Sequence, residues 1–300
     1  MDLKDLLYLD SLATHRHFGR AAEACNVSQP TLSIKIRKFE EELGIKLLER
    51  TNKRVAMTPA GLRILEHARH ALQASDSIRD VARAARDPLV GPIKLGVIPT
   101  LAPYLMPYIL KPLHETYPGL SIDLWEDQTH VLVDSLRSHK LDAALLATKT
   151  NAPEITEICL FVEPLLAVLP RQHRLAKAKE VDEDELADEL LVLAEGHCLA
   201  NQALAACGDI RGHHAGLRSS MQAATLDTLV NLVAAGYGTT LIPSLAMYSF
   251  ANREIVVRPL ARRSSRTIRL TSRSAFPRPQ ALRALEKVIR KAVGSLSKHC

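Results

Sequence analysis

The N-terminal fold follows from the stretch Phe18-Gly-Arg-Ala-Ala-Glu-Ala-Cys-Asn-Val-Ser-Gln-Pro-Thr-Leu-Ser33. Its first half predicts a short helix in which the small side chains of Ala21 and Ala22 allow another helix to pack closely. Ser28 is a suitable N-cap for a second helix, and Pro30 falls in its first turn, where the missing N–H costs little. Two helices joined by so short a turn indicate a helix-turn-helix.

The flanking residues extend this motif on both sides. An amphipathic helix over residues 3–12 precedes it, and the second helix continues to about Leu43, where Gly44 ends it. Residues 47–58 then predict two short strands with a basic tip, as in the wing of a winged helix-turn-helix. Helix-turn-helix patterns also occur in bundles whose charges are merely solvated, so the wing strengthens the DNA-binding interpretation.

A long helix follows the wing. Thr58 and Pro59 form a strong helix start, and apolar residues then recur in a narrow seam to about residue 86. A lone helix would expose that seam, which favours pairing with a second helix. We expect a DNA-binding domain over residues 1–58, a dimerising linker helix and hinge over 59–90, and a regulatory domain over 91–300.

The regulatory part alternates strands and helices, which predicts an α/β fold with parallel sheets and two subdomains flanking a cleft. The expected strands lie at 93–98, 121–126, 143–146, 165–169, 190–194 and 239–242, and the expected helices at 101–116, 129–139, 199–206 and 225–235.

Charge and composition say less about the function than these motifs do. The net charge of +6 is uneven: residues 1–60 hold ten Lys/Arg against eight Asp/Glu, and residues 250–300 hold thirteen against two. Bulk charge therefore does not single out the N-terminal part as a nucleic-acid binder. No signal peptide and no membrane-length apolar run are evident, so we expect a cytoplasmic protein that contacts no membrane. In that reducing compartment five cysteines do not suggest a structural disulfide framework.

Two cysteines stand in a position that suits thiol chemistry. Cys198 comes where an apolar run ends and a short helix begins, and the unpaired N–H groups there favour a thiolate. The neighbouring His197 is expected to lower the thiol pKa further, and Cys207, nine positions on, is a candidate resolving thiol. The residues alone leave open two unrelated buried cysteines. A zinc site with His213 lacks the short Cys-to-Cys spacing, so no metal is expected.

The order of these parts resembles the LysR-type transcriptional regulators over essentially the whole chain. The matching motifs are Phe18-x-x-Ala21-Ala22, Val27-Ser28-Gln29-Pro30-Thr31-Leu32-Ser33, Ile36-x-x-Phe39-Glu40, Leu43-Gly44, Leu47-x-x-Arg50 and Thr58-x-x-Gly61. Within that family, Gly196-His-Cys198 with Cys207 is similar to the OxyR branch, which senses hydrogen peroxide. Thr100, Thr129 and Arg266 agree with that branch.

The resemblance implies a fold and a mechanism. The fold is a winged helix-turn-helix, a long linker helix and a two-subdomain α/β module of the periplasmic-binding-protein type. Hydrogen peroxide would oxidise Cys198 to a sulfenic acid, which Cys207 would capture as a disulfide. The disulfide would switch the oligomer geometry and activate antioxidant genes. Peroxide would be bound by Thr100, Thr129, His197 and Arg266.

The resemblance also implies partners. Promoter DNA would be contacted by Gln29, Pro30, Thr31, Ser33, Lys35, Arg37, Arg50 and Arg54. RNA polymerase, a glutaredoxin- or thioredoxin-type reductant and a homodimer or homotetramer are expected, without a cofactor and without enzyme activity. Ala200 and Asn201 depart from the branch, where a charged pair is familiar, and we expect them to adjust kinetics.

Alternatives remain at this point. The chain could be a LysR-type regulator whose cleft binds a small metabolite and whose cysteines have no sensing role. It could also be a thiol peroxidase, which would share the thiol chemistry but would not require a DNA-binding domain. Thr100 and Thr129 each follow a predicted strand and open a helix, so either could simply be an N-cap. Arg266 could be one more arginine of a basic C-terminal region.

Overall fold

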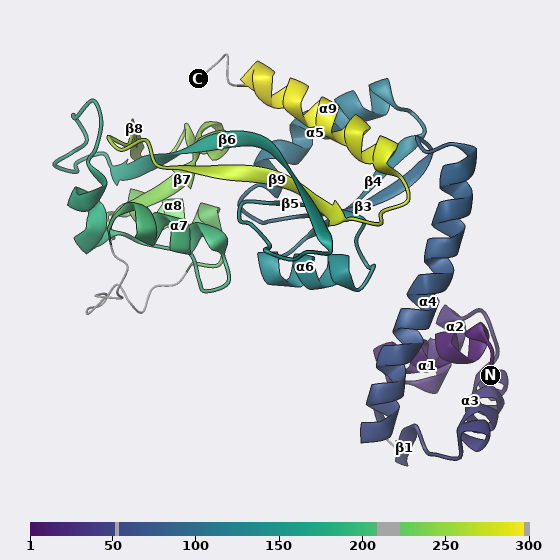
Figure 1. The fold of residues 1–300 in the computed structure, drawn as a ribbon. Coiled ribbons are helices and arrows are strands. Elements are labelled where there is room, and N and C mark those ends of the chain that lie inside the picture. The colour runs from purple at the N-terminus through teal and green to yellow at the C-terminus, as the bar shows by residue number, and fades with distance from the viewer. Residues whose placement is uncertain (52–53, 209–222, 297–300) are drawn as a thin grey trace. The chain divides into compact units, whose positions relative to one another are not determined.

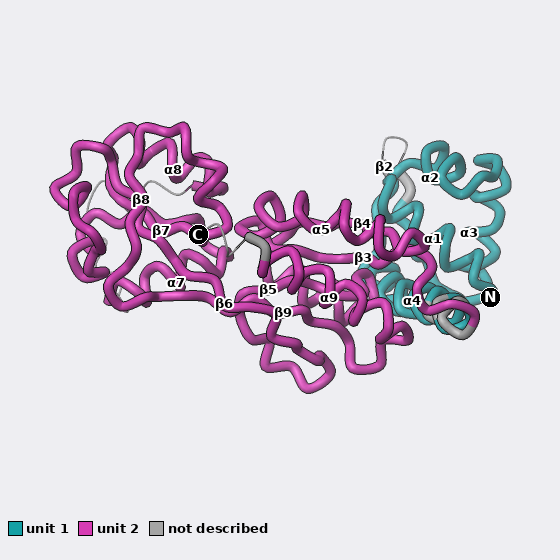
Figure 2. Tube along the Cα trace, turned by 90° about the horizontal axis from the view of Figure 1, so that it is seen from above, with its two compact units in different colours: residues 1–85 teal, residues 86–300 magenta. Residues whose placement is uncertain are grey.

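The computed structural model describes residues 1–51, 54–208 and 223–296. The chain forms two compact units, residues 1–85 and 86–300 (Figure 2). Within the described ranges, no helix is both long enough and apolar enough to cross a membrane.

The first unit contains the predicted helix-turn-helix. Its elements are α1 (Leu3–His15), α2 (Phe18–Ala24), α3 (Gln29–Leu43), β1 (Leu48–Thr51), β2 (Arg54–Met57) and most of α4 (Pro59–Arg86). The Ser28 hydroxyl accepts the Thr31 N–H at 3.3 Å, and Gly44 ends α3 with a φ of 68°, as the cap residues predicted. β1 and β2 form the predicted antiparallel wing.

A buried carboxylate fixes the start of this wing. Glu40, on the inner face of α3, accepts the N–H groups of Leu47 at 2.9 Å and Leu48 at 3.2 Å. Burial favours its protonated acid, but these two N–H groups and Lys46 outweigh burial and hold the pKa of Glu40 below its usual value. The charged carboxylate therefore ties the wing to α3, a role that the sequence did not suggest.

The second unit is an α/β fold with a strand shared by its two halves. Its elements are β3 (Gly91–Val97), α5 (Ala102–Thr116), β4 (Leu120–Glu126), α6 (Thr129–Arg137), β5 (Ala143–Leu146), β6 (Ile155–Pro170), the 3₁₀ helix η1 (Glu183–Glu189), α7 (Cys198–Ala206), α8 (Leu226–Ala234), β7 (Thr240–Pro243), the 3₁₀ helix η3 (Ser244–Phe250), β8 (Ile255–Pro259), β9 (Ser265–Arg273) and α9 (Pro279–Leu296). The strand order is β4-β3-β5-β9-β6-β7, and β8 also pairs with β6.

The prediction of parallel sheets is only partly correct. β3 pairs in parallel with β4 and β5, but β9 runs antiparallel to both β5 and β6, and β7 and β8 run antiparallel to β6. The 16-residue strand β6 causes the difference, because its first part pairs with β9 and its last part with β7 and β8. Figure 1 shows β6 and β9 side by side.

Two apolar cores define the predicted subdomains. The first gathers residues of β3, α5, β5 and α9, and the second gathers residues of the end of β6, α7, α8 and β7. The strand expected over 190–194 is not a full strand: Leu190 bridges to Thr239 and Leu193 bridges to Ala223, with no continuous ladder between them. This segment leads directly into α7.

Candidate functional site

Three of the four predicted peroxide-binding residues line one crevice, together with the predicted redox cysteine Cys198. Thr100 lies in the loop between β3 and α5, Thr129 opens α6, His197 precedes α7 and Cys198 is its first residue. The crevice wall is completed by Ile98, Pro99, Gln128 and Gly196. Residues from three separate segments thus converge at the ends of β3 and β4 and the start of α7, and the carboxyl ends of parallel strands are where open α/β sheets bind ligands.

Cys198 occupies a helix start with open N–H groups. The N-cap residue His197 makes no side-chain capping bond, so the backbone amides of Cys198 and Leu199 favour a thiolate. Burial nevertheless raises the pKa of the Cys198 thiol, against the opposing effects of the Arg266 charge, the Thr129 hydroxyl and these amides. The resting thiol is therefore mostly protonated, with the groups that stabilise its anion already in place.

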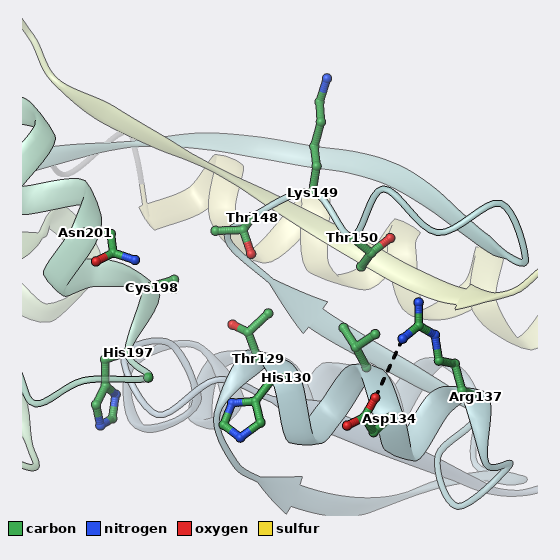
Figure 3. A pocket seen from close by; sticks show the side chains of 12 residues that line it. Thr129, His130, Asp134, Arg137, Thr148, Lys149, Thr150, His197, Cys198 and Asn201 are labelled. Atoms are coloured by element: carbon green, nitrogen blue, oxygen red, sulfur yellow. Dashed lines mark ion pairs between the residues drawn. The ribbon is translucent and has the colours of Figure 1, made fainter. Parts of the chain in front are cut away.

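His197 acts differently from the expectation. Burial lowers the pKa of its imidazole, so the ring is neutral at neutral pH and supplies no charge to stabilise a thiolate. In Figure 3 the ring and the Cys198 side chain extend in different directions from the chain. The expected lowering of the thiol pKa by His197 is wrong for this reason, and Arg266 supplies the nearby positive charge instead.

Arg266 reaches the crevice through Thr100. Its side chain is fully buried, and Nη1 donates to Thr100 Oγ1 at 2.8 Å while Nη2 donates to the Thr100 carbonyl at 3.0 Å. Arg266 is therefore not merely a solvated arginine of the C-terminal region. Because Thr100 Oγ1 accepts this bond, its own proton is directed to another acceptor. Thr100 is not the N-cap of α5, since that position is Leu101.

The partner of Arg266 is Glu163, a residue that the sequence analysis missed. Glu163 Oε2 accepts Arg266 Nε at 2.9 Å, and its Oε1 accepts the Leu245 N–H at 2.8 Å. The side chains of Glu163 and Arg266 are 1% and 0% exposed. A lone carboxylate within the apolar run 160–169 was a signal of such a pair, because charged groups are rarely buried unpaired.

Thr129 presents an unused hydroxyl to the same crevice. The N-cap of α6 is Gln128, so Thr129 is not a cap either. Its buried Oγ1 makes no hydrogen bond of standard geometry among the described residues, but it lies near enough to Cys198 to favour the thiolate. Figure 3 shows Thr129 on α6 facing Cys198 and Asn201 on α7. A buried hydroxyl without a partner costs free energy, which is recovered when a polar ligand or a thiolate lies beside it.

Gly196 allows the chain to pass this close to α6. Its φ of +93° is in the left-handed region, and an added Cβ would come within 2.2 Å of Gln128 Oε1. The Gln128 side chain also donates to the Glu195 carbonyl at 3.5 Å. Gly196 and Gln128, the second of which the sequence analysis did not single out, together set the position of Cys198.

A second pocket also has Cys198 in its lining (Figure 3). Its lining comes from α6, the segment after β5 and the start of α7, and includes Thr129, His130, Arg137, Lys149, His197, Cys198 and Asn201. Ala200 and Asn201 are the two residues that depart from the OxyR branch. Ala200 is buried, whereas Asn201 is exposed and lines the pocket that contains Cys198.

Cys207 lies at the opposite end of α7. It is 2% exposed in the core of the second subdomain, and burial, reinforced by the charges of Glu183 and Asp184, raises its pKa to about 11. Nine residues of helix separate the two cysteines by roughly 13 Å along the axis. A disulfide requires its α-carbons within about 7 Å, so α7 must unwind before the two sulfurs can join.

A further pocket lies between the two subdomains, where a small metabolite would be expected to bind. It is lined by Thr100, Tyr104, Glu126, His197 and Asp227, among others. Burial raises the pKa of Tyr104 to about 12, so that phenol is protonated at neutral pH. His213, the histidine considered above for a zinc site, lies outside the described residues.

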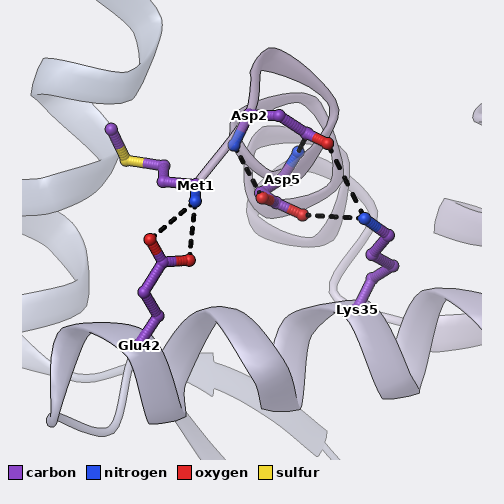
Figure 4. A network of polar contacts seen from close by, with 5 residues as sticks. All are labelled: Met1, Asp2, Asp5, Lys35 and Glu42. Carbon is purple, nitrogen blue, oxygen red and sulfur yellow. Dashed lines mark hydrogen bonds and ion pairs between the residues drawn. The ribbon is translucent and has the colours of Figure 1, made fainter.

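The proposed DNA contacts fall into three groups. Gln29, Pro30, Thr31 and Arg37 are exposed on α3, and Ser33 is half-buried. Lys35 lies 3.7 Å from the carboxylates of both Asp2 and Asp5 at the start of α1, and these carboxylates partly neutralise its charge. Nearby, the N-terminal amino group of Met1 pairs with Glu42 (Figure 4). Arg50 and Arg54 stand in β1 and β2, but their side chains lie outside the part of the structure that is described.

Comparison with known proteins gives consistent results. The description "Bacterial regulatory helix-turn-helix protein, lysR family" matches residues 3–62, and "LysR substrate binding domain" matches residues 86–294. The chain is 41% identical over 296 residues to the Escherichia coli "DNA-binding transcriptional dual regulator OxyR", covering 97% of this chain and 95% of the relative.

Solved structures agree along the whole length. A full-length OxyR variant from Pseudomonas aeruginosa is 37% identical, with a TM-score of 0.74 and coverage of 97% of this chain and 95% of that one. A hydrogen peroxide-bound OxyR variant from Corynebacterium glutamicum is 33% identical, with a TM-score of 0.67 and coverage of 98% and 93%.

Proposed function

The chain belongs to the LysR family of bacterial helix-turn-helix regulators, among its hydrogen peroxide-inducible genes activators, and from this we propose that it senses hydrogen peroxide through Cys198 and regulates transcription. The observation that supports the proposal most strongly is the crevice in which Cys198 meets Thr100 and the unpartnered hydroxyl of Thr129.

The first chemical step is oxidation of Cys198. Its thiolate attacks one peroxide oxygen, the O–O bond breaks, and the products are a sulfenic acid and hydroxide, which takes up a proton to become water. The Thr100 and Thr129 hydroxyls donate hydrogen bonds to peroxide oxygens, and the Arg266 charge favours both the thiolate and the developing hydroxide. The neutral His197 ring offers one further donor or acceptor.

The second step converts oxidation into a structural change. The Cys207 thiol attacks the sulfenic sulfur, forming the disulfide and releasing water. Because α7 must unwind for this capture, the disulfide selects a different arrangement of the helix and its neighbours, and this two-state element alters the oligomer. A glutaredoxin- or thioredoxin-type dithiol resets the protein by taking over the disulfide.

The DNA-binding unit delivers this signal to promoters. We place α3 in a major groove, with Gln29, Pro30, Thr31, Ser33, Lys35 and Arg37 near base edges or phosphates and with Arg50 and Arg54 on the backbone or minor groove. Leu62, Ile78 and Val81 of α4 are 56%, 71% and 55% exposed, which supports pairing of α4 helices in a dimer. Regulatory domains join dimers into a tetramer, which contacts RNA polymerase in the cytoplasm.

The function is tested with a peroxide-inducible promoter reporter in a host that lacks its own peroxide regulator. The unaltered chain should activate the reporter on peroxide addition, and Cys198→Ser should not. Undiminished activation by Cys198→Ser would refute the proposal.

DNA docking is tested by gel-shift titration at several salt concentrations. Arg37→Ala should weaken binding to all sequences and reduce the salt dependence by about one phosphate contact. Lys111→Ala, in α5 of the other unit, serves as the matched control and should leave the titration unchanged. An unchanged salt dependence in Arg37→Ala would exclude Arg37 from the DNA interface.

A further inference from the structure

We propose that Glu163 is a positioning residue of the redox site, which holds Arg266 at Thr100 and offsets its charge, and so sets the reactivity of Cys198. The proposal rests on the proposed function, because it assigns Glu163 a role in the same peroxide reaction. It goes further in naming a residue that touches neither the thiol nor the crevice.

The geometry leaves Arg266 little freedom. Glu163 and Arg266 are directly opposed partners in the antiparallel ladder between β6 and β9. One carboxylate oxygen of Glu163 lies 2.9 Å from Nε and 2.8 Å from Nη2 of Arg266. The other oxygen is held by the Leu245 N–H of η3 at 2.8 Å. The carboxylate is thus anchored on both sides and fixes the plane of the guanidinium.

The remaining donors of Arg266 point to the reactive loop. Nη1 and Nη2 both bind Thr100, through its hydroxyl and its carbonyl. One guanidinium therefore connects Glu163 in the sheet to a hydroxyl that lines the Cys198 crevice. A guanidinium without an anchor would lose this direction, because its side chain has several rotatable bonds.

Stability alone does not account for a pair buried this deeply. Removing two charges from water costs free energy that their attraction often fails to return, and apolar replacements of similar volume are frequently as stable. The pair does have a consequence for Cys198, whose thiolate is favoured by the Arg266 charge. A carboxylate on the far side of the guanidinium reduces the field that reaches the sulfur.

Several titratable or charged groups lie around Cys198, since His130, Asp134, Arg137 and Lys149 line the same pocket as the thiol. Arg266 faces the thiol from β9, the uncharged Thr129 faces it from α6, and on its own segment His197 is neutral at neutral pH. Of the charged groups around it, Arg266 is the one that favours the Cys198 thiolate, in addition to the amides of the α7 start, and Glu163 is the ion-pair partner of that arginine.

The same ladder contains a matched control. Glu157 and Arg269 also link β6 to β9, but their closest ion-pair distance is 3.5 Å and their side chains are 20% and 16% exposed. Glu157 binds the backbone and hydroxyl of Thr150 rather than the crevice. Glu157→Gln removes a carboxylate from the same strand without touching the Thr100 loop.

The experiment measures two quantities on the reduced full-length protein. Iodoacetamide labelling between pH 5 and 10, quantified on the Cys198 peptide by mass spectrometry, gives the ionisation midpoint of the thiol. The rate of Cys198 oxidation by hydrogen peroxide gives its reactivity, and near-UV circular dichroism confirms folding.

Glu163→Gln should lower the labelling midpoint by roughly one pH unit, because the Arg266 charge is no longer offset. Glu163→Asp keeps the charge but shortens the side chain, so its midpoint should stay near that of the unaltered protein while oxidation slows several-fold. Glu157→Gln should change neither quantity.

Unchanged midpoint and rate in both Glu163 variants would overturn the proposal. If Glu163→Gln does not fold, the proposal is tested with Glu163→Asp and with the charge-free double variant Glu163→Gln/Arg266→Gln. The double variant should have the same labelling midpoint as Arg266→Gln alone. A different midpoint would mean that Glu163 does not act through Arg266. Labelling requires no peroxide, so it tests Glu163 even if peroxide sensing itself were refuted.

Discussion

Cys198 and Cys207 stand at the two ends of one helix, yet their surroundings suit opposite roles. Cys198 packs against the core of the first subdomain, whereas Cys207 is sealed in the core of the second. Burial raises the pKa of both thiols, but at Cys198 this is opposed by Arg266, Thr129 and backbone amides. At Cys207 the carboxylates of Glu183 and Asp184 add to it.

This difference assigns an order to the two thiols. The thiolate is the nucleophile toward peroxide. Arg266, Thr129 and two backbone amides favour it at Cys198, whereas at Cys207 the charge of Arg262 is opposed by burial and two carboxylates. Cys207 has to leave an apolar core before it can react, which delays it until Cys198 has been oxidised. α7 spans the two subdomains, with Cys198 on the first and Leu199, Ala200 and Ala203 on the second, so unwinding it disturbs the contacts between them.

The largest expected effect separates the two cysteines by substitution. Cys198→Ser should reduce oxidation of the protein by peroxide by roughly a hundredfold or more, because serine has no sulfur to form a sulfenic acid and the remaining thiol of the pair, Cys207, is buried. Cys207→Ser should oxidise at Cys198 at a nearly unchanged rate and accumulate the sulfenic acid. Dimedone trapping with mass spectrometry measures both. Equal loss of oxidation in the two variants would remove the distinction between them.

The position of Cys198 is next most sensitive to Gly196. Gly196→Ala forces a side chain into a left-handed backbone and against Gln128, at a cost of roughly 1–3 kcal/mol, and it displaces the thiol. The rate of Cys198 oxidation should fall by more than about tenfold, measured by stopped-flow with peroxide. Gly294→Ala in α9, where an added methyl group meets nothing within 4 Å, is the control. A normal rate in Gly196→Ala would show that the turn is not needed for reactivity.

Thr129 offers a test that separates reactivity from stability. Thr129→Val removes an unpartnered hydroxyl, so peroxide oxidation of Cys198 should slow about tenfold while the free energy of unfolding stays equal or rises. Thr240→Val is the reverse control. Its hydroxyl donates to the Leu191 carbonyl at 2.8 Å, so that variant should lose about 1–3 kcal/mol of stability and keep its oxidation rate. A marked loss of stability in Thr129→Val would indicate a structural role.

The smallest expected effect is a change with alkaline pH in the free energy of unfolding, caused by the Cys207 thiol. Its pKa is about 11 in the folded chain against 9.0 ordinarily, so the unfolded chain releases this proton at lower pH. The free energy of unfolding should therefore fall as pH rises from about 9 to 11, by up to about 2 kcal/mol from this group. Cys207→Ala should show a shallower decline in urea unfolding, and Cys159→Ala, an exposed site, should not. Identical declines would contradict the buried-thiol account.

Much of the fold could be predicted from local patterns. The caps Ser28 and Gly44 mark the ends of α3, and the strands and helices from β3 to β5 lie close to their predicted ranges. Local patterns could not reveal that β6 is one strand shared by two subdomains, because pairing partners lie far along the chain. β9 was not among the expected strands, and its antiparallel pairing with β5 and β6 also depends on residues far apart in the sequence.

The residues of the site also fall into those that the sequence could predict and those that it could not. The position of Cys198 at a helix start could be predicted from its own segment, and family resemblance supplied Thr100, Thr129 and Arg266. Glu163 lies 103 residues from Arg266 in the sequence, and only the ladder between β6 and β9 brings them together. The charge of His197 was misjudged because burial, which lowers its pKa, is a tertiary property.

The most direct test of the account is time-resolved mass spectrometry of the reduced protein after one equivalent of hydrogen peroxide. A sulfenic acid should form at Cys198 first, followed by a disulfide between Cys198 and Cys207 as the sulfenic acid disappears. Oxidation of Cys207 before Cys198, or full oxidation without a linkage between them, would contradict it.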